Sequence, residues 1–135
     1  MVSSTPIQRP LAVMMRSTAQ AISPDATVCD AARQMRLAKV GALLVREGVN
    51  YLGIVSEADL VRKVLAESLV PTEILVRSVM SAPLITIDIA ASAHDASDVM
   101  AQAGIRHLAV LDGGEVAGIL SVRDLLRYFK NWGPQ

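Results

Sequence analysis

The hydrophobic positions of residues 21–69 follow first a helical period and then short unbroken apolar runs. A helix is predicted over Thr27–Lys39, because apolar residues recur at the i, i+3, i+4, i+7 spacing of one buried face, at Val28, Ala31, Ala32 and Met35. The run ALLV is typical of a strand covered on both faces, and REGVN and YLGIVS then predict a turn and a second strand. A second helix is expected from Ser56 to about Leu69.

The same pattern returns 65 residues later without a gap. The phrase GIVSEADL at residues 53–60 reappears as GILSVRDL at residues 118–125, and even the turn glycine repeats. The chain therefore consists of two copies of one unit. Each copy is expected to hold a helix, two strands and a helix, preceded by a short extended piece at Ala21–Ile22 or Leu84–Ile87.

The segment VPTEILVRSVMSAP, which joins the copies, carries two prolines and no Gly/Ser tract. It predicts a structured connection, not a flexible tether. We expect an N-terminal extension at 1–10, a first domain at 11–70, a second at 71–130 and a C-terminal tail at 131–135. The economical α/β arrangement is two small sheets, each flanked by helices, packed sheet to sheet about a pseudo-twofold axis.

Composition points to an assembly of several chains. Hydrophobic residues make up 52% of the sequence and the mean hydropathy is +0.40. Such a chain is expected to cover part of its apolar surface with another copy, as a homodimer or larger oligomer. The aromatic residues Tyr128, Phe129 and Trp132 would contact that second subunit or pack on the protein's own core.

Charge and cysteine content exclude several partners. Basic and acidic residues both total 13, so no overall positive field favours nucleic acid. The single cysteine, Cys29, cannot form an internal disulfide, and no metal-ligand spacing involves it. The apolar run Leu11–Met15 is too short for a signal peptide, and no later stretch approaches the length of a membrane span. We expect a cytoplasmic protein with no membrane partner.

Every predicted major helix begins with Ser or Thr followed three residues later by Asp. This spacing is that of a capping box, which satisfies free backbone N–H groups, so it does not by itself mark a functional pair. Two boxes, at Ser56 and Ser121, directly follow a strand, where unpaired N–H groups and the helix dipole favour an anion. There the hydroxyl could donate to phosphate, and the carboxylate one turn later could accept from the vicinal hydroxyls of a ribose.

These residues resemble a tandem pair of cystathionine-β-synthase (CBS) domains, or Bateman module, from about Leu11 to Arg127. The resemblance rests on SPDATVCDAARQM, VGALLV and GIVSEADL in the first copy and on SAHDASDVM, IRHLAVLD and GILSVRDL in the second. It implies a stand-alone CBS-domain protein whose clefts hold an adenosine-containing ligand: AMP, ADP, ATP, NAD or S-adenosylmethionine. No other cofactor is expected.

The resemblance also implies roles for particular residues. Asp59 and Asp124 would contact ribose, and the serine of each box would contact phosphate. Arg106 and His107 match the family's phosphate-reaching Arg-His pair, although a cleft between pseudo-symmetric domains could assign them to either site. The complete set of expected ligand-binding residues is Ile22, Ser23, Ser56, Asp59, Thr86, Ile87, Arg106, His107, Ser121, Arg123 and Asp124.

The two copies differ in these phosphate-binding residues. The first copy has Gly41 and Ala42 in place of the Arg-His pair, and Ala58 in place of Arg123. The site at Asp124 is therefore expected to hold a phosphorylated ligand more tightly.

An enzyme is the least supported class, because no cysteine, histidine or serine lies in a recognisable nucleophile or acid-base arrangement. The leading hypothesis is an adenine-nucleotide sensor of energy or redox state that changes conformation or subunit arrangement on binding. The alternative is an oligomerisation or partner-binding scaffold with vestigial sites. In both cases the output would pass to the oligomer or to an unknown protein target.

Overall fold

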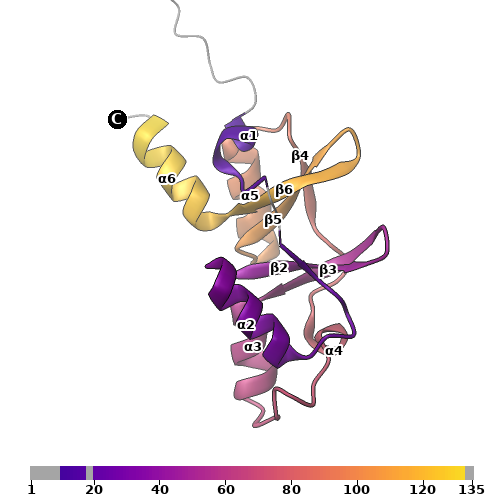
Figure 1. The fold of residues 1–135 in the computed structure, drawn as a ribbon. Coiled ribbons are helices and arrows are strands. Elements are labelled where there is room, and N and C mark those ends of the chain that lie inside the picture. Colours follow the sequence, from indigo (N-terminus) through magenta and orange to yellow (C-terminus); the bar gives the residue numbers. More distant parts are fainter. Residues whose placement is uncertain (1–9, 18–19, 133–135) are drawn as a thin grey trace, which may run out of the picture. The chain divides into compact units, whose positions relative to one another are not determined.

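The computed structural model describes residues 10–17 and 20–132 of the 135-residue chain (Figure 1). The predicted N-terminal extension at 1–10 and C-terminal tail at 131–135 lie largely outside these described residues. None of the helices in this part of the chain has the length and apolarity that a membrane span requires.

The chain forms two compact units, each built on its own three-stranded sheet. In the described part of the chain, the first unit comprises residues 20–85, and the second comprises residues 10–17 and 86–132. These units are offset from the expected ranges 11–70 and 71–130, because the segment in front of each repeat packs with the other repeat. The predicted mixed α/β class, with two small sheets flanked by helices, is confirmed.

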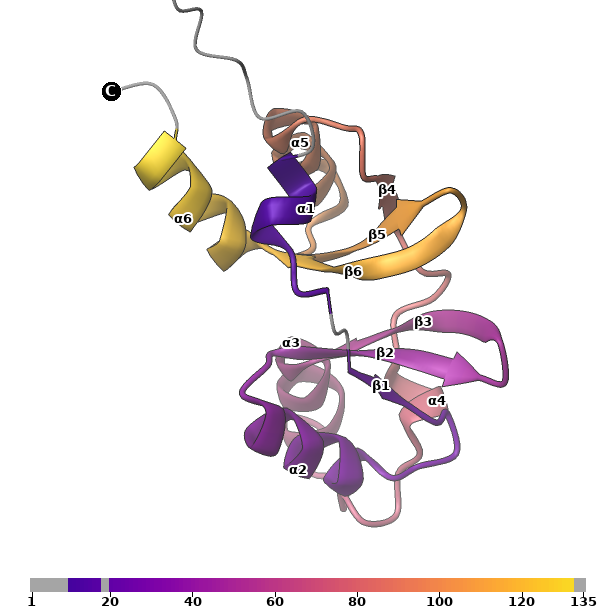
Figure 2. The same cartoon turned by 45° about the horizontal axis from the view of Figure 1, so that its top comes forward.

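The first unit places its helices against one face of a sheet of order β1-β2-β3 (Figure 2). β1 is parallel to β2, and β2 is antiparallel to β3. Buried side chains from the sheet, such as Leu43 and Val55, pack with Ala31, Val64 and Val76. The elements are β1 (Ala21–Ile22), α2 (Val28–Ala38), β2 (Ala42–Glu47), β3 (Asn50–Ser56), α3 (Glu57–Leu60), the π-helix η1 (Val61–Leu65) and α4 (Val76–Val79).

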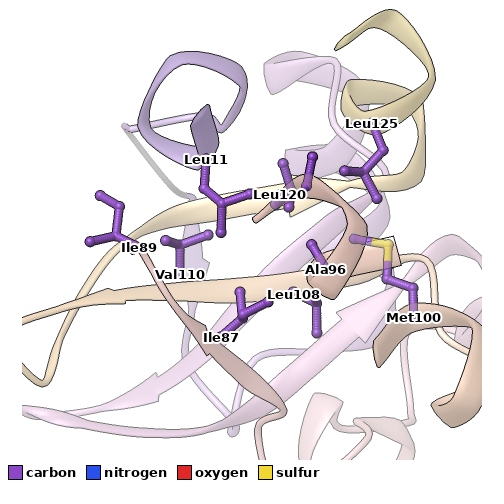
Figure 3. Packing of buried hydrophobic residues seen from close by; sticks show 10 residues of the cluster. Leu11, Ile87, Ile89, Ala96, Met100, Leu108, Val110, Leu120 and Leu125 are labelled. Atoms are coloured by element: carbon purple, nitrogen blue, oxygen red, sulfur yellow. The ribbon is translucent and has the colours of Figure 1, made fainter. Parts of the chain in front are cut away.

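The second unit repeats this topology with strand order β4-β5-β6. Its core joins residues that are far apart in the sequence: Leu11, fully buried, packs with Val110, Leu120 and Leu125 (Figure 3). The elements are α1 (Pro10–Met14), β4 (Thr86–Asp88), α5 (Ala93–Ala103), β5 (His107–Asp112), β6 (Glu115–Ser121) and α6 (Val122–Trp132).

The predicted helix boundaries are confirmed where a capping residue marks the end of the helix. The helix predicted over Thr27–Lys39 is confirmed as α2, with Thr27 as N-cap and a left-handed C-cap at Lys39. The continuous helix predicted from Ser56 to Leu69 is wrong at its end, because α3 gives way to a π turn that closes at Leu65. The connection between the repeats is structured, as predicted, and contains α4.

Two of the three aromatic residues near the C-terminus follow one of the alternatives that the sequence left open. Tyr128 and Phe129 pack against the core of the second unit. The Phe129 ring also lies 5.0 Å from that of His94 on α5, centroid to centroid. The side chain of Trp132 lies outside the described residues. Packing on the protein's own core therefore holds for two of these residues.

Candidate functional site

Each unit has a strand that runs directly into a helix. β3 ends at Ser56 and leads into α3, and β6 ends at Ser121 and leads into α6. The register of β5 and β6 places His107 opposite Ser121. The Val122 N–H donates to the Arg106 carbonyl oxygen at 2.9 Å. The structure therefore brings Arg106, His107 and Ser121 to one end of the second sheet.

The predicted capping boxes are all present. The Ser121 N–H donates to Asp124 Oδ2 at 2.9 Å, and the Asp124 N–H donates to the Ser121 hydroxyl at 3.1 Å. The same reciprocal pair forms in the other three boxes, at Thr27 and Asp30, Ser56 and Asp59, and Ser92 and Asp95. Each box uses the carboxylate oxygen Oδ2, so Oδ1 remains for other partners.

The two carboxylates that follow strands differ at this second oxygen. Asp59 Oδ1 lies 2.9 Å from Lys63 Nζ and accepts a hydrogen bond from the Ser81 hydroxyl at 3.3 Å. Asp124 Oδ1 has Arg127 Nη1 at 4.0 Å, and within residues 10–17 and 20–132 no hydrogen bond reaches it. Asp59 Oδ1 is thus occupied by partners, whereas Asp124 Oδ1 accepts no hydrogen bond from the described residues; the Asp124 side chain is 14% exposed and that of Asp59 is 9% exposed.

The predicted phosphate-binding residues gather around the Asp124 box. The side chains of Arg106 and Arg123 are exposed, and His107 is half-buried on β5. Arg106 borders an open hollow of about 370 Å³ whose lining also includes Met100, Val122 and Leu125. Arg106 and the start of α6 therefore lie at the same end of the second sheet.

Of the four candidate residues in the extended pieces, two have buried side chains and two have exposed ones. Ile22 and Ile87 are 8% and 9% exposed, and both side chains belong to the hydrophobic cores. Ser23 and Thr86 are exposed, and the Ser23 hydroxyl accepts a hydrogen bond from the Asp25 N–H at 3.1 Å. Any contact of the two isoleucines with a ligand would therefore involve their backbone.

A family model described as CBS domain matches the sequence twice, at residues 11–66 and 76–131. The chain belongs to the CBS-domain family. The two matches fall on the two repeats, so the tandem CBS pair predicted from the motifs is confirmed. CBS domains as a class are regulatory or ligand-binding modules.

Curated relatives of this CBS pair include the CBS domain-containing protein YhcV of Bacillus subtilis. The identity is 32% over 111 residues, which cover 82% of this chain and 79% of that protein. An uncharacterised protein of Methanopyrus kandleri is 35% identical over 107 residues, which cover 78% of this chain. The matched region is 55% of that relative and 22% of a CBS domain-containing protein of Arabidopsis thaliana, so the chain spans only part of these proteins.

Solved structures share the fold. A CBS-domain protein of Burkholderia ambifaria, with a proposed role in signal transduction, superposes with a TM-score of 0.83 at 30% identity over 88% of both chains. A hexameric CBS-CP12 protein of bloom-forming cyanobacteria gives a TM-score of 0.81 at 28% identity, covering 91% of this chain and 73% of that one.

In this CBS pair, the segment that precedes each repeat forms an isolated β-bridge with the last strand of the other repeat. Ser81 and Ile54 exchange backbone hydrogen bonds of 2.8 and 3.0 Å, and Arg16 and Ile119 exchange bonds of the same lengths. The two bridges are 65 residues apart in both partners, so Ser81 and Arg16 occupy equivalent places. Each bridge places the segment that precedes one repeat beside the end of the other repeat's last strand, which leads into a capping box.

The bridges explain the glycine that opens each repeated motif. A Cβ atom on Gly53 would overlap the Ser81 carbonyl oxygen, and one on Gly118 would overlap the Arg16 carbonyl oxygen. Neither glycine has the positive φ at which glycine is favoured for its backbone. The motif therefore needs glycine here because another backbone approaches closely.

Arg77 holds the connecting segment of the first unit in place. Its Nη2 donates to Asp25 Oδ1 at 3.1 Å and to Glu47 Oε2 at 3.0 Å. Hydrogen bonds to Asp25 and then to Glu47 raise the pKa of the guanidinium above its usual value. These exposed pairs orient α4 and contribute little to stability.

Proposed function

We propose that this CBS pair is an adenine-nucleotide-binding regulatory module. The observation that carries the proposal is the accessible Oδ1 of Asp124, one turn from the Ser121 hydroxyl and beside exposed arginines. A carboxylate oxygen can accept hydrogen bonds from ribose hydroxyls, and hydroxyl, N–H and guanidinium groups can donate to phosphate. The sequence predicts no nucleophile or acid-base arrangement for catalysis, so we assign binding and not turnover to the site.

Regulation requires that the ligand favour one conformation or subunit arrangement over another. The bridge between Arg16 and Ile119 lies at the strand that ends in Ser121, so a ligand at Asp124 would lie close to a junction of distant segments. The output passes to the oligomer or to a separate protein target.

A thermal-shift panel tests the binding function. AMP, ADP, ATP, NAD and S-adenosylmethionine are added to protein from which carried-over ligands have been removed. A ligand at a hundredfold excess over its dissociation constant adds about 2.7 kcal/mol, and the midpoint should rise by roughly 5–10 °C. The dideoxy analogue of AMP, which lacks both ribose hydroxyls, is the matched control and should give a smaller rise. If no ligand moves the midpoint at millimolar concentration, the binding function is wrong.

A scaffold function is the second candidate, and exposed apolar side chains favour it. Leu37, Leu65 and Leu126 are 76%, 63% and 66% exposed. Such side chains are commonly covered by another chain. A CBS-CP12 protein of the same fold is hexameric, which supports an assembly of several chains here.

We expect a homodimer or a larger assembly in solution. Light scattering at micromolar concentration should give at least twice the chain mass of 14.4 kDa. Leu126→Glu, which puts a charge at one of these exposed apolar positions, should lower the measured mass, whereas Glu115→Lys at an exposed position on β6 should not. A monomer across a wide dilution series would contradict the prediction.

A further inference from the structure

The Asp59 carboxylate has no acceptor position to spare. A carboxylate offers about four lone-pair sites on its two oxygens. Asp59 Oδ2 accepts from the Ser56 N–H at 2.9 Å and from the Ser56 hydroxyl at 3.1 Å. Asp59 Oδ1 accepts from Lys63 Nζ at 2.9 Å and from the Ser81 hydroxyl at 3.3 Å. A ribose hydroxyl can reach this carboxylate only by displacing one of these donors.

Lys63 is held at this position from two sides. Its ammonium also donates to the Val79 carbonyl oxygen at 2.9 Å, at the end of α4. The spacing of four residues puts Asp59 and Lys63 on one helix face, where such pairs meet. Because the Asp59 side chain is only 9% exposed, the ion pair is less screened by water than a surface pair. The lysine therefore joins the capping box to the connecting segment.

The second repeat lacks both of these donors. Tyr128 stands at the position equivalent to Lys63 and packs against the core of its unit. Arg16 stands at the position equivalent to Ser81. The cation that does approach Asp124, Arg127 Nη1, is 4.0 Å away, which is beyond hydrogen-bonding distance. The two repeats thus carry the same motif, but only the Asp59 carboxylate has donors within hydrogen-bonding distance of both oxygens among the described residues.

We propose that Lys63 keeps the first repeat closed to ligands with a vicinal diol, so that each chain offers one ribose-binding carboxylate and not two. The proposal rests on the nucleotide-binding function proposed above. It makes Lys63 a residue that determines site occupancy. Removing its ammonium should open Asp59 to ribose even though a positive charge is lost.

Calorimetric titration with AMP tests the proposal. The proteins compared are the wild type, Lys63→Met, Asp124→Ala and the double variant. The wild type should bind one AMP per chain, and Asp124→Ala should weaken this binding roughly ten- to a hundredfold. Lys63→Met should bind a second AMP, and the double variant should retain that new site with at least tenfold higher affinity than Asp124→Ala. Arg62→Met removes the same charge from the neighbouring exposed residue and should change nothing.

Each result decides the proposal. If Lys63→Met weakens AMP binding or leaves the stoichiometry at one, the proposal is overturned while the nucleotide-binding function stands. If the wild type binds neither AMP nor any other ligand of the thermal-shift panel, the proposed function fails. An AMP site gained in Lys63→Met would then still support the proposal that Lys63 closes the first repeat, and no gain would overturn that proposal as well. Circular dichroism monitors folding, and Lys63→Tyr, which copies the residue of the second repeat, is the second variant. It should open the site in the same way.

Discussion

Replacing Asp124 with alanine is expected to weaken AMP and ATP binding ten- to a hundredfold. Hydrogen bonds to charged groups contribute about 1.5–3 kcal/mol each, which corresponds to that loss of affinity. Asp124 Oδ1 accepts no hydrogen bond from the described residues, and the exposed Arg127 approaches it at 4.0 Å. Isothermal titration of both nucleotides measures the change.

Two control variants separate binding from capping. Asp124→Asn retains a side-chain oxygen that can accept from the Ser121 N–H, but it loses the negative charge. It should fold like the wild type and lose most of the affinity. Asp59→Ala should have the smaller effect on binding, since Lys63 and Ser81 already occupy its carboxylate. Equal losses, or a larger loss in Asp59→Ala, would show that the asymmetry between the repeats is assigned to the wrong copy.

The fold could be predicted where short-range patterns determine it. The stripe of apolar residues and the capping box at Thr27 are both local, and α2 lies within one residue of each predicted end. The end of the helix after Ser56 depends instead on a π turn, in which the Ala66 N–H donates to the Val61 carbonyl oxygen. Apolar periodicity does not distinguish that turn from an α-helix.

The compact units could not be predicted from the repeat alone. Residues 11–16 were expected to belong to the first domain, at 11–70, yet Leu11 is buried in the core of the second unit. Such an exchange depends on contacts between residues about a hundred positions apart, and no local pattern encodes it.

The candidate site was predicted in part. The capping boxes and the neighbourhood of Arg106, His107 and Ser121 follow from motif and strand register. Lys63 was not predicted as a site residue, although its position four residues after Asp59 was a usable signal. Ser81 had no such signal, because it reaches Asp59 only through the bridge to β3.

The same bridge leads to the prediction with the largest effect on stability. Gly53→Ala would push a methyl group into the Ser81 carbonyl and disrupt the two hydrogen bonds that Ser81 and Ile54 exchange. Overpacking and the lost hydrogen bonds should together lower the free energy of unfolding by about 2–4 kcal/mol. Gly118→Ala should act in the same way through Arg16. Thermal denaturation should show a drop of roughly 10 °C for each variant.

Gly48→Ala is the matched control for this prediction. Gly48 has a φ of +61° and no atom within 4 Å of an added Cβ. The free-energy cost of alanine there therefore comes only from the left-handed backbone conformation. That strain amounts to about 1–2 kcal/mol. A cost at Gly53 no greater than that at Gly48 would mean that the connecting segment does not lie against β3 in solution. The Ser81 hydroxyl would then be lost from Asp59, and the two carboxylates would differ only through Lys63.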